Sequence, residues 1–347
     1  MSRRELLALA ARAGVTAAAA PVIAGLSSCA RSLPLTTSTG PVGSPATATL
    51  KPPLQGFLDE ATTPLYDWML GYVRNLDWSE LQASAGGPII MNSRLVSDIE
   101  EVRAFNAAHP SQAPRGIKLR TGAAGGAPND VKAIGGGPFK VTDPGPPRIS
   151  AGVGAFWLVE YQTAYADFQD KLAAWLDPIP EVREVTMALP ALIYEEPFTR
   201  YSTNALAPGK WTVSLDEQSF TAMLTAHQVW KSTRQDLAYT VYNAPGGSND
   251  FQLTFLTTAR KAFGPQLVNG NNALNANSKD SPLYRAITSA GPPIYFQEAG
   301  SLRLGSPPAA YAIGVACGAN AIEIQKYAGI AQSVLLEYQR ELLANPA

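Results

Sequence analysis

The chain has 347 residues, of which 27 are basic and 28 acidic, and its formal net charge at neutral pH is −1. This balance gives no support to a nucleic-acid partner or to binding at an anionic membrane surface, since both attract strongly basic proteins. Two histidines, two cysteines and no glycine-rich phosphate loop are present, so the sequence predicts no metal, no nucleotide cofactor and no disulfide framework.

The N-terminus has the features of an export signal. Arg3 and Arg4 precede an alanine-rich apolar stretch that runs to about Leu26 and is interrupted by Arg12, which argues against a membrane-spanning helix. The arginine pair resembles a twin-arginine signal, and the following Leu-Ser-Ser-Cys resembles a lipobox of bacterial lipoproteins. This resemblance implies that residues 1–28 are removed and that Cys29 is lipidated. The alternative is a plain secretory or amphipathic N-terminus with a chance cysteine.

Residues 29–53 are rich in Ser, Thr, Pro, Gly and Ala and contain almost no large apolar side chains. Such a segment cannot bury enough surface to offset its ordering entropy, so it predicts a flexible linker. Residues 54–347 remain for one globular domain. We therefore expect an exported protein that a lipid anchor alone holds on the extracytoplasmic face of the membrane.

Apolar, β-branched runs alternate with helical patterns along this domain. Strands are expected over 69–76, 116–120, 182–193, 237–242, 266–269, 293–296 and 321–324. Helices are expected over 93–108, 156–176, 215–234, 251–263, 282–290 and 330–343. With a degenerate unit near 54–66, this alternation predicts eight strand–helix units and a single (β/α)8 barrel. An open doubly wound sheet is the alternative, against which the missing glycine fingerprint counts.

Functional residues of such barrels gather at the carboxyl ends of the strands. The polar and aromatic residues expected there are Asn75, Asp77, Trp78, Arg120, Glu195, Glu196, Tyr242, Asn243, Asn269, Asn271, Asn272, Gln297, Glu298, Glu323 and Gln325. Carboxylates supply acid–base or covalent chemistry, amides bind hydroxyl groups and aromatic rings stack on sugars. The set therefore predicts a carbohydrate site, in which two carboxylates flank one glycosidic bond.

The segment Val73–Leu81 (VRNLDWSEL) resembles a Val-Arg-…-Trp-Ser-x-Leu segment on an early strand of the clan A glycoside hydrolases. The resemblance covers residues 65 to 325 only in the order and spacing of short motifs. It implies an acid/base glutamate at the end of the fourth strand, where Glu196-Pro197 stands, and a nucleophile at the end of the seventh, where Glu298 stands. This sequence departs from the clan at Glu195, where an asparagine is usual, and that puts the substrate or the activity in doubt.

On this basis Glu196 protonates the leaving oxygen and later activates water, while Glu298 attacks the anomeric carbon in a retaining mechanism. Glu195 is the alternative acid. The residues expected to bind substrate are Arg74, Asp77, Trp78, Arg120, Glu195, Tyr242, Asn271 and Glu323.

Structural roles compete with each of these assignments. Glu323 can instead pair with Arg120 or Arg74, Asn271 can satisfy a tight turn, and Trp78 can pack in the core. Exposed glutamates are also common on any surface.

Three functions therefore remain open: a glycoside hydrolase acting on a cell-envelope or extracellular glycan, a non-catalytic glycan-binding lipoprotein, and, less favoured, the solute-binding lipoprotein of a transporter. The oligomeric state is not predicted.

Overall fold

The computed structural model describes residues 49–347 except 61–63, 65, 144–148, 191–192, 195–196, 198–202, 240–248, 279–280, 301–303 and 326–329. The signal peptide and most of the linker predicted for residues 1–53, including Cys29, lie outside the described residues. None of the described helices is both long and apolar enough to cross a membrane.

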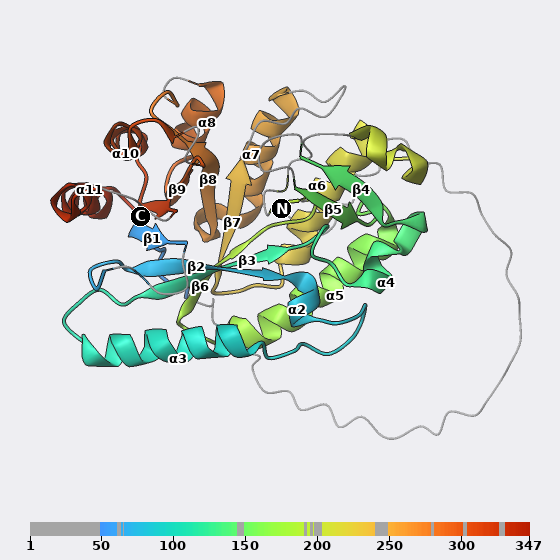
Figure 1. Cartoon of the computed structure of the whole chain (residues 1–347), viewed down its shortest axis with the longest axis horizontal. Coiled ribbons are helices and arrows are strands. Elements are labelled where there is room, and N and C mark those ends of the chain that lie inside the picture. Colours follow the sequence, from blue (N-terminus) through green and yellow to red (C-terminus); the bar gives the residue numbers. More distant parts are fainter. Residues whose placement is uncertain are drawn as a thin grey trace, which may run out of the picture. The chain divides into compact units, whose positions relative to one another are not determined.

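The predicted eight-stranded barrel is confirmed (Figure 1). Its strands, in chain order, are β1 (Gly56–Asp59), β2 (Gly71–Asp77), β3 (Gly116–Gly122), β6 (Val182–Thr186), β7 (Arg234–Tyr239), β8 (Leu267–Leu274), β9 (Ile294–Glu298) and β10 (Ala321–Ile324). All neighbouring pairs are parallel, and β1 closes the ring by pairing with both β2 and β10. The degenerate first unit is therefore a real barrel strand, although a short one.

Helices follow most of these strands and cover the outside of the barrel. They are α2 (Trp78–Leu81), α3 (Ser93–Ala108), α4 (Asn129–Lys132), α5 (Val159–Leu176), α6 (Val213–His227), α7 (Asn249–Phe263), α8 (Pro282–Ala290), α10 (Pro307–Ala316) and α11 (Gln332–Ala344). An antiparallel hairpin of β4 (Phe139–Thr142) and β5 (Ser150–Val153), which was not predicted, is inserted between β3 and α5.

Two predicted elements are longer than the observed ones. The strand expected over 182–193 ends at Thr186, and Pro190, which has no N–H to donate, would interrupt any pairing further along. The helix expected over 215–234 ends at His227, and Arg234 already begins β7. In the turn between α6 and β7, the Asp177 carboxylate accepts hydrogen bonds from the N–H groups of Lys231, Ser232 and Thr233. These bonds fix the path of the chain into β7.

The interior of the barrel has an apolar layer and a charged layer. The apolar layer consists of Leu54, Leu58, Val73, Ala238, Val268, Tyr295 and Ala321. At Gly270 on β8 an added Cβ would lie 1.9 Å from the Tyr295 ring, so the absence of a side chain there makes room for that ring. The larger apolar cluster lies between the strands and the surrounding helices.

The charged layer is centred on Lys118 of β3, which is fully buried. Its ammonium lies 2.6 Å from Asp236 of β7, 2.7 Å from Glu323 of β10 and 3.4 Å from Glu184 of β6. The same ammonium is 3.3 Å from the centre of the Tyr295 ring. One lysine thus joins three other barrel strands through their carboxylates, in a place where an uncompensated charge is costly.

Replacing Lys118 with methionine is expected to lower the free energy of unfolding by about 3–5 kcal/mol, because three buried carboxylates lose their shared cation. Denaturant unfolding measures the change. Lys140→Met on the exposed side of β4 is the matched control, and we expect it to stay within about 0.5 kcal/mol of the parent. Equal stability of Lys118→Met and the parent would contradict the role of this layer.

Candidate active site at the carboxyl ends of the strands

Glu298 lies where the sequence predicts it, as the last residue of β9, which is the seventh strand of the barrel. Glu298 is buried, with 5% of its surface exposed. One carboxylate oxygen accepts a hydrogen bond from the hydroxyl of Tyr311 in α10, and the other accepts one from the Gln325 N–H at 2.8 Å. These two bonds fix the carboxyl group at the end of the barrel.

Burial raises the pKa of Glu298 to about 7, and the negative charge of Glu60 adds to the increase. The hydrogen bonds from Tyr311 and Gln325 act in the opposite direction, because they stabilise the ionised form. A carboxyl group with this pKa exchanges its proton near neutral pH. It therefore has the property required of a group that takes part in acid–base or nucleophilic chemistry.

Arg120 of β3 organises the polar groups beside Glu298. Its guanidinium bonds to Glu323, approaches the Gln297 amide oxygen at 3.3 Å and lies 3.6 Å from a carboxylate oxygen of Glu60. Arg120 is buried, and it connects the carboxyl ends of β1, β9 and β10. Arg120 thus bonds to groups of the protein itself, and it would act on a ligand through the positions of Gln297 and Glu60.

Glu60, immediately after β1, is a site residue that the sequence analysis missed. Its side chain is 13% exposed, and its charge acts on both Arg120 and Glu298. The signal available was the acidic pair Asp59-Glu60 after the short apolar run Phe57-Leu58. The run is too short to identify it as a barrel strand from the sequence, so it does not mark Glu60 as a residue at a strand end.

Glu323 occupies the barrel interior, where it bonds to both Lys118 and Arg120. Of the two roles considered for it, pairing with Arg120 is the one that the structure shows. The other arginine, Arg74, is turned to the outside of the barrel and pairs with Asp98 of α3.

Two further predicted substrate residues are part of the packing. Trp78 is fully buried, stacks on Phe168 and donates its indole N–H to Gln82 at 2.9 Å, so it has no face left for a sugar. Asn271 is buried between β8 and α8, where it donates to the Tyr239 carbonyl and accepts from the Tyr284 hydroxyl. The structural alternatives hold for both residues.

Asp77 is exposed at the end of β2, where it precedes α2. Burial of part of its side chain and the charge of Glu80 raise its pKa, while Lys132 lowers it. The Asp77 N–H donates to the Glu80 carboxylate at 2.8 Å, which fixes the first turn of α2. Asp77 thus remains a candidate for contact with a ligand.

Glu195, Glu196 and Tyr242 lie outside the described residues. The fourth barrel strand ends at Thr186, which is ten residues before Glu196 in the sequence. Among the residues that the structure describes, no group of three His, Cys, Asp or Glu side chains could hold a metal ion.

No protein-family model matches the chain, and no curated protein matches it. Its fold is similar to those of several solved structures at low identity. One is XacCel5A, with 12% identity, a TM-score of 0.45 and coverage of 79% of this chain and 86% of that one. Another is endo-glycoceramidase II from Rhodococcus sp., with 13% identity, a TM-score of 0.47 and coverage of 81% and 77%. These likenesses are too distant to carry an activity over to this chain.

The raised pKa of Glu298 predicts a pH dependence of stability. Since the folded-state pKa is about 7 and the ordinary value is 4.5, the stabilising contribution is complete below about pH 4.5 and is lost as the pH rises through 7. We expect this group to lower the free energy of unfolding by about 3 kcal/mol over this pH range. Denaturant unfolding at pH 4.5 and 8 should show that Glu298→Gln loses less stability than the parent over this interval. Identical pH profiles would contradict the burial argument.

Proposed function

We propose that the protein is a glycoside hydrolase that cleaves a glycosidic bond of a cell-envelope or extracellular glycan, with Glu298 and Glu196 as its two carboxylates. The observation that carries this proposal is the buried carboxyl of Glu298 at the end of the seventh strand of a closed barrel, held by Tyr311 and Gln325. The carboxyl ends of barrel strands are where this fold places its chemistry.

In the proposed retaining mechanism, the ionised Glu298 attacks the anomeric carbon while Glu196 gives a proton to the departing oxygen. Glu196 then takes a proton from water, the resulting hydroxide attacks the same carbon, and Glu298 leaves as a carboxylate. This route needs the two carboxyl groups about 5–5.5 Å apart. The hydrogen bonds from Tyr311 and Gln325 favour the ionised form of Glu298, which is the form that attacks and departs.

A second candidate, a lipoprotein that binds glycans without cleaving them, is favoured by one specific observation. The fourth strand, β6, ends at Thr186, and none of the next four described residues, 187–190, carries a carboxylate. The third candidate, a two-lobed solute-binding protein, finds no support in the closed single barrel.

Glu298→Gln is expected to reduce turnover by at least about a thousandfold, because the amide is a poor nucleophile and does not ionise. Release of reducing sugar from a panel of glycans measures turnover. The kcat/KM of the wild-type protein should fall below about pH 7, because Glu298 becomes protonated there. Glu196→Gln should have a comparable effect.

Glu337→Gln in the C-terminal helix α11 is a matched control that should leave turnover unchanged. Retained turnover in Glu298→Gln would exclude the proposed mechanism. Glycan binding without turnover in the wild-type protein would favour the second candidate.

We also infer that the chain is exported and anchored through lipid on Cys29. Cys29→Ser is expected to move the protein from the membrane fraction to the soluble fraction of a bacterial expression host and to abolish incorporation of radiolabelled fatty acid. Cys317→Ser is the matched control and should change neither result. Labelling that persists in Cys29→Ser would disprove the anchor.

A further inference from the structure

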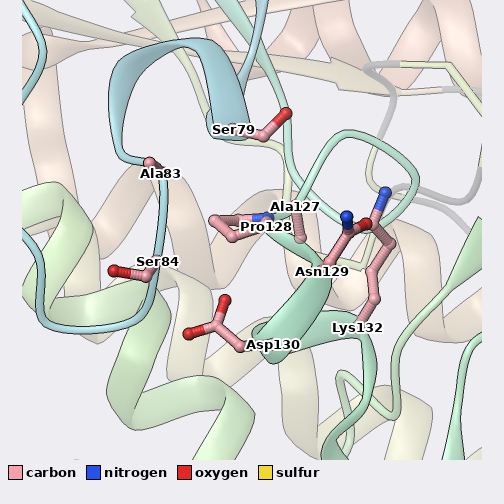
Figure 2. Close-up of a pocket in the computed structure, with 8 residues that line it drawn as sticks. All are labelled: Ser79, Ala83, Ser84, Ala127, Pro128, Asn129, Asp130 and Lys132. Atoms are coloured by element: carbon pink, nitrogen blue, oxygen red, sulfur yellow. The ribbon is translucent and has the colours of Figure 1, made fainter.

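A cavity of about 400 Å³ is lined by residues of α2, of α4 and of the segments next to them. These two helices follow the carboxyl ends of β2 and β3 (Figure 1). Figure 2 shows its walls, which are formed by Ser79, Ala83, Ser84, Ala127, Pro128, Asn129, Asp130 and Lys132. Because α2 follows β2 directly, the cavity opens at the same end of the barrel as Glu298. Its size falls within the range of small-molecule sites, which begins at about 300 Å³.

The walls of the cavity are held together by hydrogen bonds across its two sides. The Ser79 N–H donates to the Gly126 carbonyl at 2.9 Å, and the Ala85 N–H donates to the Asp130 carboxylate at 2.9 Å. The Lys132 ammonium donates to the Gly125 carbonyl at 3.0 Å. These bonds hold the loops in place before a ligand binds, so binding would not carry the entropic cost of ordering them.

Asp77 links the cavity to the end of the barrel. A Cβ at Gly126 would lie 2.3 Å from an Asp77 carboxylate oxygen, and a Cβ at Gly122 would lie 2.7 Å from the same oxygen. Glycine at both positions therefore allows the loop after β3 to lie against Asp77. The positive charge of Lys132 also acts on this carboxylate.

The chemistry of the lining fits a neutral ligand that is rich in hydroxyl groups. The hydroxyls of Ser79 and Ser84 and the amide of Asn129 make no hydrogen bond to any other described residue, so they are available to a ligand. Asp130 and Lys132 carry opposite charges, so the lining has no net charge. Of the apolar lining residues, Ala83 is exposed, whereas Ala127 and Pro128 are buried, so the lining offers a ligand little apolar surface.

We propose that this cavity binds a sugar unit of a glycan chain, at a distance from the bond that is cleaved. The proposal rests on the function proposed above and extends it to the form of the substrate. Since β2 lies three places from β9 around the barrel, a ligand that reaches both the cavity and Glu298 must be longer than one sugar unit. The cavity would thus select oligosaccharides over short glycosides.

The test uses the full-length chain in a non-glycosidic detergent, with two variants of the cavity. Ala83→Phe fills it from an exposed wall position, and Asn129→Ala removes a polar group. Ala107→Phe on α3 and Asn277→Ala after β8 are the matched controls at exposed positions outside the cavity. The probes are cello-, xylo- and chito-oligosaccharides from disaccharide to hexasaccharide, together with nitrophenyl monoglycosides.

We expect Ala83→Phe to raise KM about tenfold on the hexasaccharide that is cleaved, and Asn129→Ala to raise it severalfold. Neither should alter KM on the monoglycoside, and the controls should match the parent on both. Calorimetric binding in a Glu298→Gln background should show the same losses without turnover.

Equal KM values for the parent and Ala83→Phe on long substrates would overturn the cavity proposal alone. A change of equal size on the monoglycoside, or no binding of any oligosaccharide to the parent, would overturn it as well. Turnover that survives Glu298→Gln would instead overturn the proposed function. If the wild-type protein binds oligosaccharides without cleaving them, and Ala83→Phe abolishes this binding, the cavity proposal is supported even though the catalytic proposal fails.

Discussion

The ion pairs of Lys118 connect strands on several sides of the barrel interior. A single buried ammonium contacts carboxylates from β6, β7 and β10 and lies over the ring of Tyr295 from β9. Removing Lys118 would leave three carboxylates without their shared cation in the buried interior of the barrel. The layer therefore ties five of the eight strands to one arrangement, and burial raises the pKa of Glu184 within it.

The candidate site at the end of the barrel is built on this layer. Glu323 bonds to Lys118 with one carboxylate oxygen and to Arg120 with the other, and Arg120 reaches Gln297 and Glu60. The polar groups near Glu298 are thus connected to the interior without a break. Such a chain of contacts holds side chains in fixed positions, which is what a preorganised site requires.

Elements whose ends are set by neighbouring residues could be predicted closely, whereas residues whose partners are distant in the sequence could not. Helices α3 and α8 begin and end at the predicted residues, because Asn92 and Ser281 cap their N-termini with side-chain oxygens. The strand β6 is shorter than predicted, because the apolar run Met187-Ala188-Leu189 after Thr186 resembles a strand in sequence but is not part of the sheet. Lys118 and Glu60 were overlooked, since a lysine or glutamate beside an apolar run does not show which partners will surround it.

The eight-fold alternation of strand and helix and the place of Glu298 at the end of the seventh strand could both be predicted from the sequence. Both follow from periodicity and order along the chain, which are local properties. Three features could be seen only in the tertiary structure. Arg74 pairs with Asp98 outside the barrel, Trp78 is buried in the core, and Arg120 binds Glu323 inside the barrel. Each of these depends on which face of a strand or helix a side chain occupies and on partners far away in the sequence. Closure of the barrel fixes both.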